Sequence, residues 1–101
     1  MEDITVAELK ERISNKETLN IIDVREPNEF EAFNIGAKLI PMSELTDRLK
    51  DFEPYKEEEL ILHCRSGARS GKVKLFLEGL GYDKVRNLLG GMLKWQETEE
   101  A

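Results

Sequence analysis

The sequence has little cysteine or histidine, with one residue of each among 101. A single cysteine cannot form an internal disulfide, and a free thiol is easiest to keep in a reducing compartment, so we expect a cytoplasmic protein. Zinc sites in proteins use about four ligands, and no cluster of carboxylates replaces the missing cysteines and histidines. We therefore expect no metal ion and no other cofactor.

Long hydrophobic runs and an excess of basic residues are also absent. No segment approaches the roughly 20 apolar residues of a membrane span, and the first residues do not resemble a signal peptide. The chain has 21 acidic and 15 basic residues, a net charge of −6, and no aromatic residues interleaved with a basic patch. This composition argues against membranes and nucleic acids as partners. A length of 101 residues predicts a single domain over 1–101.

The one cysteine, Cys64, stands in a short polar segment between two hydrophobic stretches. Residues 60–63 are typical of a buried strand, and residues 69–80 have apolar side chains at helical spacing. The predicted core face of that helix consists of Val73, Phe76, Leu77 and Leu80. Cys64 is thus expected at the carboxyl end of a strand and beside a helix N-terminus, where open α/β sheets bind ligands.

The charges around Cys64 favour its reactive form. Between residues 60 and 77 there is no Asp or Glu, whereas four basic residues occur: Arg65, Arg69, Lys72 and Lys74. Gly67 can adopt a positive φ and Ala68 is small, so the loop backbone can curl around an anion. Helix N–H groups and guanidinium groups stabilise a thiolate, which is the nucleophilic form of cysteine. An isolated cysteine is more often an inert core residue, but these neighbours together favour a nucleophile.

Strand and helix patterns alternate along the whole chain. Thr5 and Glu8 predict a capped helix over 6–14, and Gly91 begins the last predicted helix. Strands are predicted at 19–24, 39–40, 60–63 and 85–87, and the other helices after 27, after 43 and over 69–80. Alternating strands and helices predict an α/β fold, with a mostly parallel sheet covered on both faces.

Four segments, in order, resemble those of the rhodanese-type sulfurtransferases. The segment Cys64-Arg65-Ser66-Gly67-Ala68-Arg69-Ser70 is similar to the active-site loop of that family, and Asp23-Val24-Arg25-Glu26 to its Asp-Val-Arg-Glu element. Gly36-Ala37 before a short strand, and Gly90-Gly91 followed by Trp95, match two further signatures. One departure is visible: Asn34 stands where many members have His, and the proline before the Gly-Ala pair is missing.

This resemblance implies both a fold and an activity. The implied fold is a three-layer α/β/α sandwich with five strands, the cysteine loop following the fourth. The implied activity is thiosulfate sulfurtransfer, in which Cys64 takes a sulfane sulfur from thiosulfate or a related donor and holds it as a persulfide. The substrate-binding loop then consists of Arg65, Ser66, Gly67, Ala68 and Arg69. The two arginines are expected to hold the anionic donor, because guanidinium groups suit bidentate contacts with oxyanions.

A persulfide on Cys64 would need an external acceptor, because the chain has no second cysteine to remove the sulfur. Cyanide serves as a laboratory acceptor for enzymes that resemble this one. Glutathione, thioredoxin or a sulfur-carrier protein are the expected cellular acceptors.

Four residues near the loop are interpreted as supporting groups. Asp23 and Arg25 end a strand near the ligand-binding edge, and we expect a buried ion-pair network there, with direct substrate contact as the alternative. Ser70 has no basic partner in the sequence, so it is expected to hydrogen-bond the loop or cap the helix. His63 should point to the face of its strand opposite Cys64, which favours a structural role.

Two other functions remain open from the sequence. Cysteine-based phosphatases and arsenate reductases also use a Cys-loop-Arg cradle, but their pattern has five residues between Cys and Arg, and here four separate Cys64 from Arg69. A shorter loop favours a sulfur atom over a phosphoryl group. The second alternative is a non-catalytic or slow module that carries or senses a persulfide.

Overall fold

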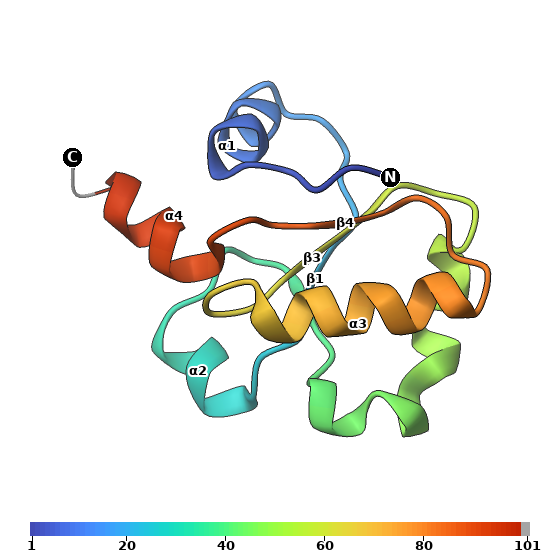
Figure 1. Ribbon diagram of the computed structural model, residues 1–101. Coiled ribbons are helices and arrows are strands. Elements are labelled where there is room, and N and C mark those ends of the chain that lie inside the picture. The colour runs from blue at the N-terminus through green and yellow to red at the C-terminus, as the bar shows by residue number, and fades with distance from the viewer. Residues whose placement is uncertain (100–101) are drawn as a thin grey trace.

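The computed structural model describes residues 1–99 and has a parallel four-stranded sheet between two groups of helices (Figure 1). In chain order the elements are α1 (Val6–Ser14), β1 (Ile21–Asp23), α2 (Pro27–Ala32), β2 (Lys38–Leu39), the 3₁₀ helices η1 (Met42–Glu44), η2 (Thr46–Asp51) and η3 (Glu53–Tyr55), β3 (Leu60–His63), α3 (Ala68–Gly79), β4 (Val85–Asn87) and α4 (Gly91–Glu99). The strand order is β2-β1-β3-β4, and each neighbouring pair is parallel. Strand β3, which leads to Cys64, is therefore interior.

The sheet separates two hydrophobic cores, which confirms the predicted layered α/β architecture. On one face, α3 and the 3₁₀ helices pack over side chains of β1, β3 and β4, and α1 and α4 pack on the other face (Figure 1). The first core contains Ile22, Val24, Ile40, Phe52, Leu60, Leu62, Cys64, Val73, Leu77, Tyr82 and Val85. The second contains Ile4, Val6, Leu9, Ile61, Leu88, Met92 and Trp95. Alternate residues of β3 enter different cores, as the two-residue period of a strand requires.

The expected fifth strand is wrong for the described residues 1–99, where the sheet has four strands. A fifth segment lies beside β4 but pairs at one position only, where Ile4 bridges Leu88 in parallel. The pairing stops there because Thr5 is already the N-cap of α1, its hydroxyl accepting a hydrogen bond from the Glu8 N–H at 3.1 Å. If the Ile4 bridge is counted as a strand, the cysteine loop follows the fourth, as expected.

Helix α3 buries a different face from the one its apolar residues predict. Val73 and Leu77 are buried as expected, but Phe76 is 39% exposed and Leu80 is 45% exposed. The third buried side chain of the helix is Ser70, one turn before Val73. The buried face of α3 begins with the polar residue Ser70 because the helix starts at the cysteine loop. The spacing of hydrophobic residues alone does not predict that a serine is buried there.

The segment after Pro41 also differs from the expected single helix. It forms three short 3₁₀ helices, and Arg48 departs from helical angles (φ −120°, ψ 25°). The break leaves Leu45 and Leu49 half-buried rather than fully packed. Pro54 is the second residue of the last of the three, η3, where its missing N–H is tolerated because it lies in the first turn of a helix.

Asn34 forms the turn that precedes the Gly36-Ala37 pair. Its side-chain amide donates to the Phe30 carbonyl at 3.0 Å, and its carbonyl oxygen accepts from the Gly36 N–H at 2.9 Å. Gly36 has a positive φ of 82°. Asn side chains stabilise turns of this kind, so the chain completes the turn without the missing histidine and proline.

Candidate active site

Cys64 follows directly after β3, and α3 begins at Ala68, so residues 64–67 form a tight loop. Gly67 is the N-cap of α3, with left-handed angles of φ 100° and ψ −9°. A glycine adopts these angles without the strain of a Cβ. The left-handed conformation of Gly67 turns the chain so that N–H groups at the start of α3 point toward the cysteine, as the sequence predicts for this loop.

Hydrogen-bond donors of the loop surround the Cys64 sulfur. The N–H of Gly67 lies 3.1 Å from Sγ, the N–H of Ser70 3.4 Å, and the Ser70 hydroxyl 3.3 Å. Burial raises the pKa of the Cys64 thiol, but hydrogen bonds from Ser70, Gly67 and the Ser66 N–H outweigh burial and lower the pKa overall. The site therefore stabilises a thiolate.

Little of Cys64 reaches the surface, since the residue is only 1% exposed. Its sulfur lies below the loop, with the first core of the sheet behind it. A reaction partner must therefore present a small projecting atom to reach this sulfur. A bulky group would have to displace the loop.

Asn87, at the end of β4, holds the donors in place and was missed by the sequence analysis. Its amide nitrogen donates to the Gly67 carbonyl at 3.0 Å, and its side-chain oxygen accepts from the Ser70 hydroxyl. Asn87 thus contacts Gly67 and Ser70, whose groups lie 3.1 to 3.4 Å from the Cys64 sulfur. The sequence places Asn87 at the end of the strand predicted at 85–87, but no local pattern links it to Ser70, 17 residues earlier.

The start of α4 secures the other side of the loop. The N–H groups of Met92 and Leu93 donate to the carbonyls of Cys64 and Arg65, at 3.0 and 2.9 Å. Gly91 makes this approach possible, because a Cβ at this position would lie 2.5 Å from the Cys64 oxygen. The second glycine of the C-terminal signature therefore serves the cysteine loop.

The two arginines of the loop are placed differently. Arg65 is exposed, and within residues 1–99 its side chain has no hydrogen bond or ion pair. Arg69 is held by Glu29 of α2, with its two terminal nitrogens 2.7 and 2.8 Å from the two carboxylate oxygens. This pairing lowers the pKa of Glu29 to about 2 and raises that of Arg69. Glu29 was not among the predicted site residues.

Asp23 and Arg25 form the buried ion pair that the sequence suggests. The Arg25 guanidinium lies 2.7 Å from an Asp23 oxygen and also donates to the Phe33 carbonyl at 2.7 Å. His63 lies against this pair, with Nε2 3.7 Å from Asp23, on the sheet face opposite Cys64. Burial lowers the pKa of His63 to about 4, so the imidazole is neutral at neutral pH. Its place on the opposite face of the sheet keeps it from taking a proton from the thiol.

A shallow hollow at the mouth of the loop brings several of these residues together. Its walls include Arg25, Glu29, Phe33, Arg65 and Leu93. Arg25 is 5% exposed, so the part of the ion pair that reaches the hollow is small. Arg65 is the residue of the cysteine loop that lines this hollow.

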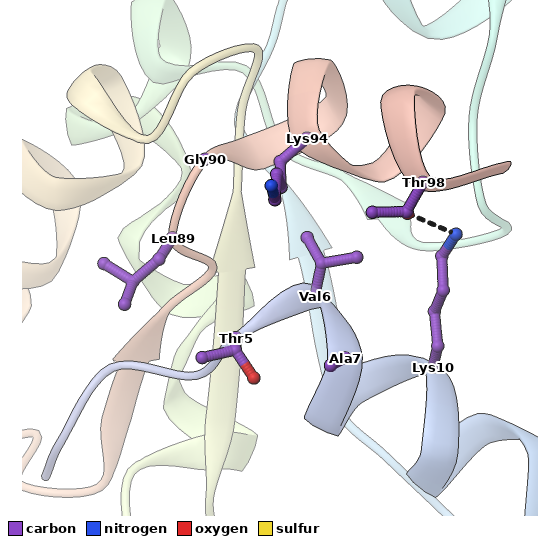
Figure 2. Close-up of a pocket in the computed structure, with 8 residues that line it drawn as sticks. All are labelled: Thr5, Val6, Ala7, Lys10, Leu89, Gly90, Lys94 and Thr98. Carbon is purple, nitrogen blue, oxygen red and sulfur yellow. Dashed lines mark hydrogen bonds between the residues drawn. The ribbon is translucent and has the colours of Figure 1, made fainter. Parts of the chain in front are cut away.

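A second groove lies between α1 and α4 (Figure 2). Val6, Ala7 and Leu89 line it together with Lys94, and Lys10 donates to the Thr98 hydroxyl at 2.8 Å (Figure 2). None of the predicted site residues lines this groove.

The described residues contain neither a cluster of metal ligands nor a membrane-spanning helix. Within residues 1–99 no three His, Cys, Asp or Glu side chains are gathered so that they could hold a metal ion. None of the helices described combines the length and the apolar character needed to cross a bilayer.

The parallel sheet, with a thiol of lowered pKa between a strand and a helix N-terminus, defines a protein of the α/β class with a candidate cysteine site. Residues 5–98 match the family model of the rhodanese-like domain, and the chain belongs to that family. The resemblance seen in the sequence is thereby confirmed.

Individual relatives agree with this assignment. The chain is 41% identical over 76 residues to YqhL of Bacillus subtilis (strain 168), covering 74% of this chain and 59% of YqhL. It is 32% identical to a sulfurtransferase of Allochromatium vinosum, covering 92% of this chain and 86% of that protein. The crystal structure of SSP1007 from Staphylococcus saprophyticus superposes with a TM-score of 0.84 at 40% identity, covering 94% of this chain and 93% of that one.

Proposed function

We propose that the protein is a sulfurtransferase that moves a sulfane sulfur through a persulfide on Cys64. The supporting observation is the set of donors around the Cys64 sulfur, from Gly67 and Ser70, which lowers the pKa of a buried thiol. Such donors stabilise the thiolate before reaction and the persulfide anion after it. Sulfurtransferases among the relatives support the same chemistry.

The proposed reaction has two half-reactions. In the first, the Cys64 thiolate attacks the outer sulfur of thiosulfate or a related donor, the donor S–S bond breaks, and sulfite leaves with the electron pair. In the second, an external nucleophile such as cyanide or a thiol takes the outer sulfur and regenerates the thiolate. Covalent catalysis of this kind predicts ping-pong kinetics.

The burial of Cys64 favours sulfur transfer over phosphoryl transfer. An outer sulfane sulfur is a single projecting atom, which suits a residue that is 1% exposed. A phosphoryl group carries three oxygens that must all be accommodated by the loop. The four-residue spacing between Cys64 and Arg69 supports the same choice, because loop length sets the size of the backbone anion site.

The acceptor is proposed to be external. Within residues 1–99 only one cysteine is available, so no second thiol can resolve the persulfide. Glutathione, thioredoxin or a sulfur-carrier protein would serve as acceptor in a reducing cytoplasm.

Mass spectrometry of the protein after treatment with thiosulfate tests the proposal. We expect one additional sulfur on Cys64, lost on addition of cyanide as thiocyanate forms, and no addition or turnover in Cys64→Ser. Full thiosulfate:cyanide activity in Cys64→Ser would refute the mechanism. A persulfide that forms but never turns over would identify a carrier module, and hydrolysis of p-nitrophenyl phosphate without persulfide formation would identify a phosphatase.

A further inference from the structure

Arg69, which the sequence assigns to the anionic donor, is already bound by a carboxylate. Both terminal nitrogens of its guanidinium donate to Glu29, one to each oxygen, at 2.7 and 2.8 Å. A bidentate pair uses the same two N–H directions that would hold an oxyanion of the donor. Glu29 therefore occupies the position that a donor oxyanion would take on Arg69.

The Glu29 carboxylate is held in place by α2 as well as by Arg69. It accepts a hydrogen bond from the Glu26 N–H at 3.1 Å, which forms a capping box with Glu26 at the start of the helix. The pKa of Glu29 is lowered to about 2, chiefly by Arg69, so the group is ionised at neutral pH. Displacing it from Arg69 would leave a charged carboxylate in the mouth of the site.

The net charge at the mouth is smaller than the loop sequence suggests. Glu29 and Arg65 line the same hollow, and Arg69 interacts electrostatically with both Cys64 and Glu26. The charges of Arg69 and Glu29 cancel. Among residues 1–99 this leaves the guanidinium of Arg65 as the unpaired cation near Cys64. A donor with two negative charges is thus attracted less strongly than two free arginines would attract it, whereas a donor with less charge loses less.

We infer that Glu29 is a specificity determinant of the Cys64 site: by neutralising Arg69 it disfavours dianionic donors such as thiosulfate and favours thiol persulfides. This inference rests on the proposed sulfur transfer. In a thiol persulfide, R–S–SH, the reacting end carries no oxyanion. The Cys64 thiolate attacks the outer sulfur, the donor S–S bond breaks, and the thiol RSH leaves with the electron pair and the proton. The Cys64 persulfide remains, and no oxidant is required.

The test compares two donors in Glu29→Gln and in a matched control, Glu31→Gln. Glutamine keeps the size of Glu29 and its acceptor for the Glu26 N–H, and Glu31 is an exposed residue of the same helix. The donors are thiosulfate and the persulfide of N-acetylcysteamine, which has no other charge. We expect kcat/KM for thiosulfate to rise about tenfold in Glu29→Gln, because the guanidinium of Arg69 is then free to attract the donor and charges near a protein surface interact on this scale. The persulfide kcat/KM and both Glu31→Gln values should change less than about twofold.

A double variant separates electrostatics from a loss of structure. In Glu29→Gln/Arg69→Gln the released guanidinium is gone, so the gain with thiosulfate should disappear. Equal changes with both donors in Glu29→Gln, or a gain that persists in the double variant, would overturn the role of Glu29 while sulfur transfer itself stands. Failure of the unaltered protein to take sulfur on Cys64 from either donor would refute the proposed function and this inference together.

Discussion

The hydroxyl of Ser70 lies within reach of two acceptors, the Cys64 sulfur and the side-chain oxygen of Asn87. It has one proton to donate. When Cys64 is a thiolate, its full charge makes it the stronger acceptor, so the hydroxyl donates to the sulfur. The Ser70 N–H at 3.4 Å and the Gly67 N–H at 3.1 Å are fixed by the backbone and donate in either state.

Ser70→Ala should therefore raise the pKa of the Cys64 thiol. The hydroxyl is the largest of the interactions that lower this pKa, and its loss leaves burial less opposed. A hydrogen bond to a charged group contributes about 1.5–3 kcal/mol, so the midpoint of thiol ionisation should move to clearly higher pH. The measurement is the rate of alkylation by iodoacetamide as a function of pH.

Ser66→Ala is the matched control for Ser70→Ala. Ser66 belongs to the same loop, is exposed, and contributes its backbone N–H rather than its hydroxyl to the thiol. Its alkylation profile should follow that of the unaltered protein. An unchanged midpoint in Ser70→Ala, or equal shifts in both variants, would show that the hydroxyl does not stabilise the thiolate.

Single residues also mark what could and could not be predicted from the sequence. The position of Cys64 was predictable because the strand before it and the helix after it are contiguous in the chain. The contacts of Asn87 and Glu29 with this part of the chain were not, since their partners are 17 and 40 residues away in the sequence. Arg69 lies in the first turn of α3, and its pairing with Glu29 is visible only in three dimensions.

At the scale of elements, the start of α4 and the cysteine loop form one unit. The N-terminal N–H groups of α4, from Met92 and Leu93, satisfy carbonyls of Cys64 and Arg65. These are N–H groups that a helix cannot satisfy internally. The last helix thus fixes the loop that the strand β3 and the helix α3 create.

Gly91→Ala should disrupt this unit. Gly91 has a φ of 54°, and a Cβ there would lie 2.5 and 2.6 Å from the carbonyl oxygens of Cys64 and Arg65. Left-handed strain and overpacking together predict a loss of about 2–5 kcal/mol in the free energy of unfolding. Urea denaturation followed by circular dichroism measures this loss, and sulfur transfer should fall with it.

Gly79→Ala provides the comparison, because a Cβ at Gly79 meets no atom within 4 Å. Gly79 is the last residue of α3, where alanine has the better helix propensity. Its free energy of unfolding should equal or exceed that of the unaltered protein. If Gly91→Ala were as stable as Gly79→Ala, α4 would not depend on close contact with the loop.

The elements that were predicted correctly are those that local sequence patterns define. Helix α1 and strands β3 and β4 were predicted with their observed bounds, because capping and apolar runs are local signals. The fifth strand was wrong because the pairing of Ile4 with Leu88 is limited by the N-cap at Thr5. The buried face of α3 was partly wrong because packing on the loop, rather than hydrophobicity, places Ser70 inside.

At the scale of the whole molecule, stability should depend on the protonation of His63. Its imidazole is fully buried between the sheet and the second core, and within residues 1–99 neither ring nitrogen has a hydrogen-bond partner. Burial lowers its pKa from 6.5 to about 4, while Asp23 raises it in part and Arg25 lowers it further. Folding therefore requires a neutral imidazole, whereas the unfolded chain binds a proton below its ordinary pKa.

This difference predicts that the free energy of unfolding falls as the pH drops from 6.5 toward 4, because the unfolded state takes up a proton that the folded state excludes. Between pH 7.5 and pH 5 the loss should be about 2 kcal/mol. Carboxylates with lowered pKa values, such as Glu29 and Glu59, lose their stabilising pairs mainly at lower pH, below their ordinary pKa of 4.5. Urea denaturation at pH 7.5 and at pH 5 measures the effect. His63→Leu and His63→Gln remove the titrating group, so in both variants the free energy of unfolding should change less between pH 7.5 and pH 5. If either variant lost as much stability as the unaltered protein over this range, the pH dependence would belong to other groups.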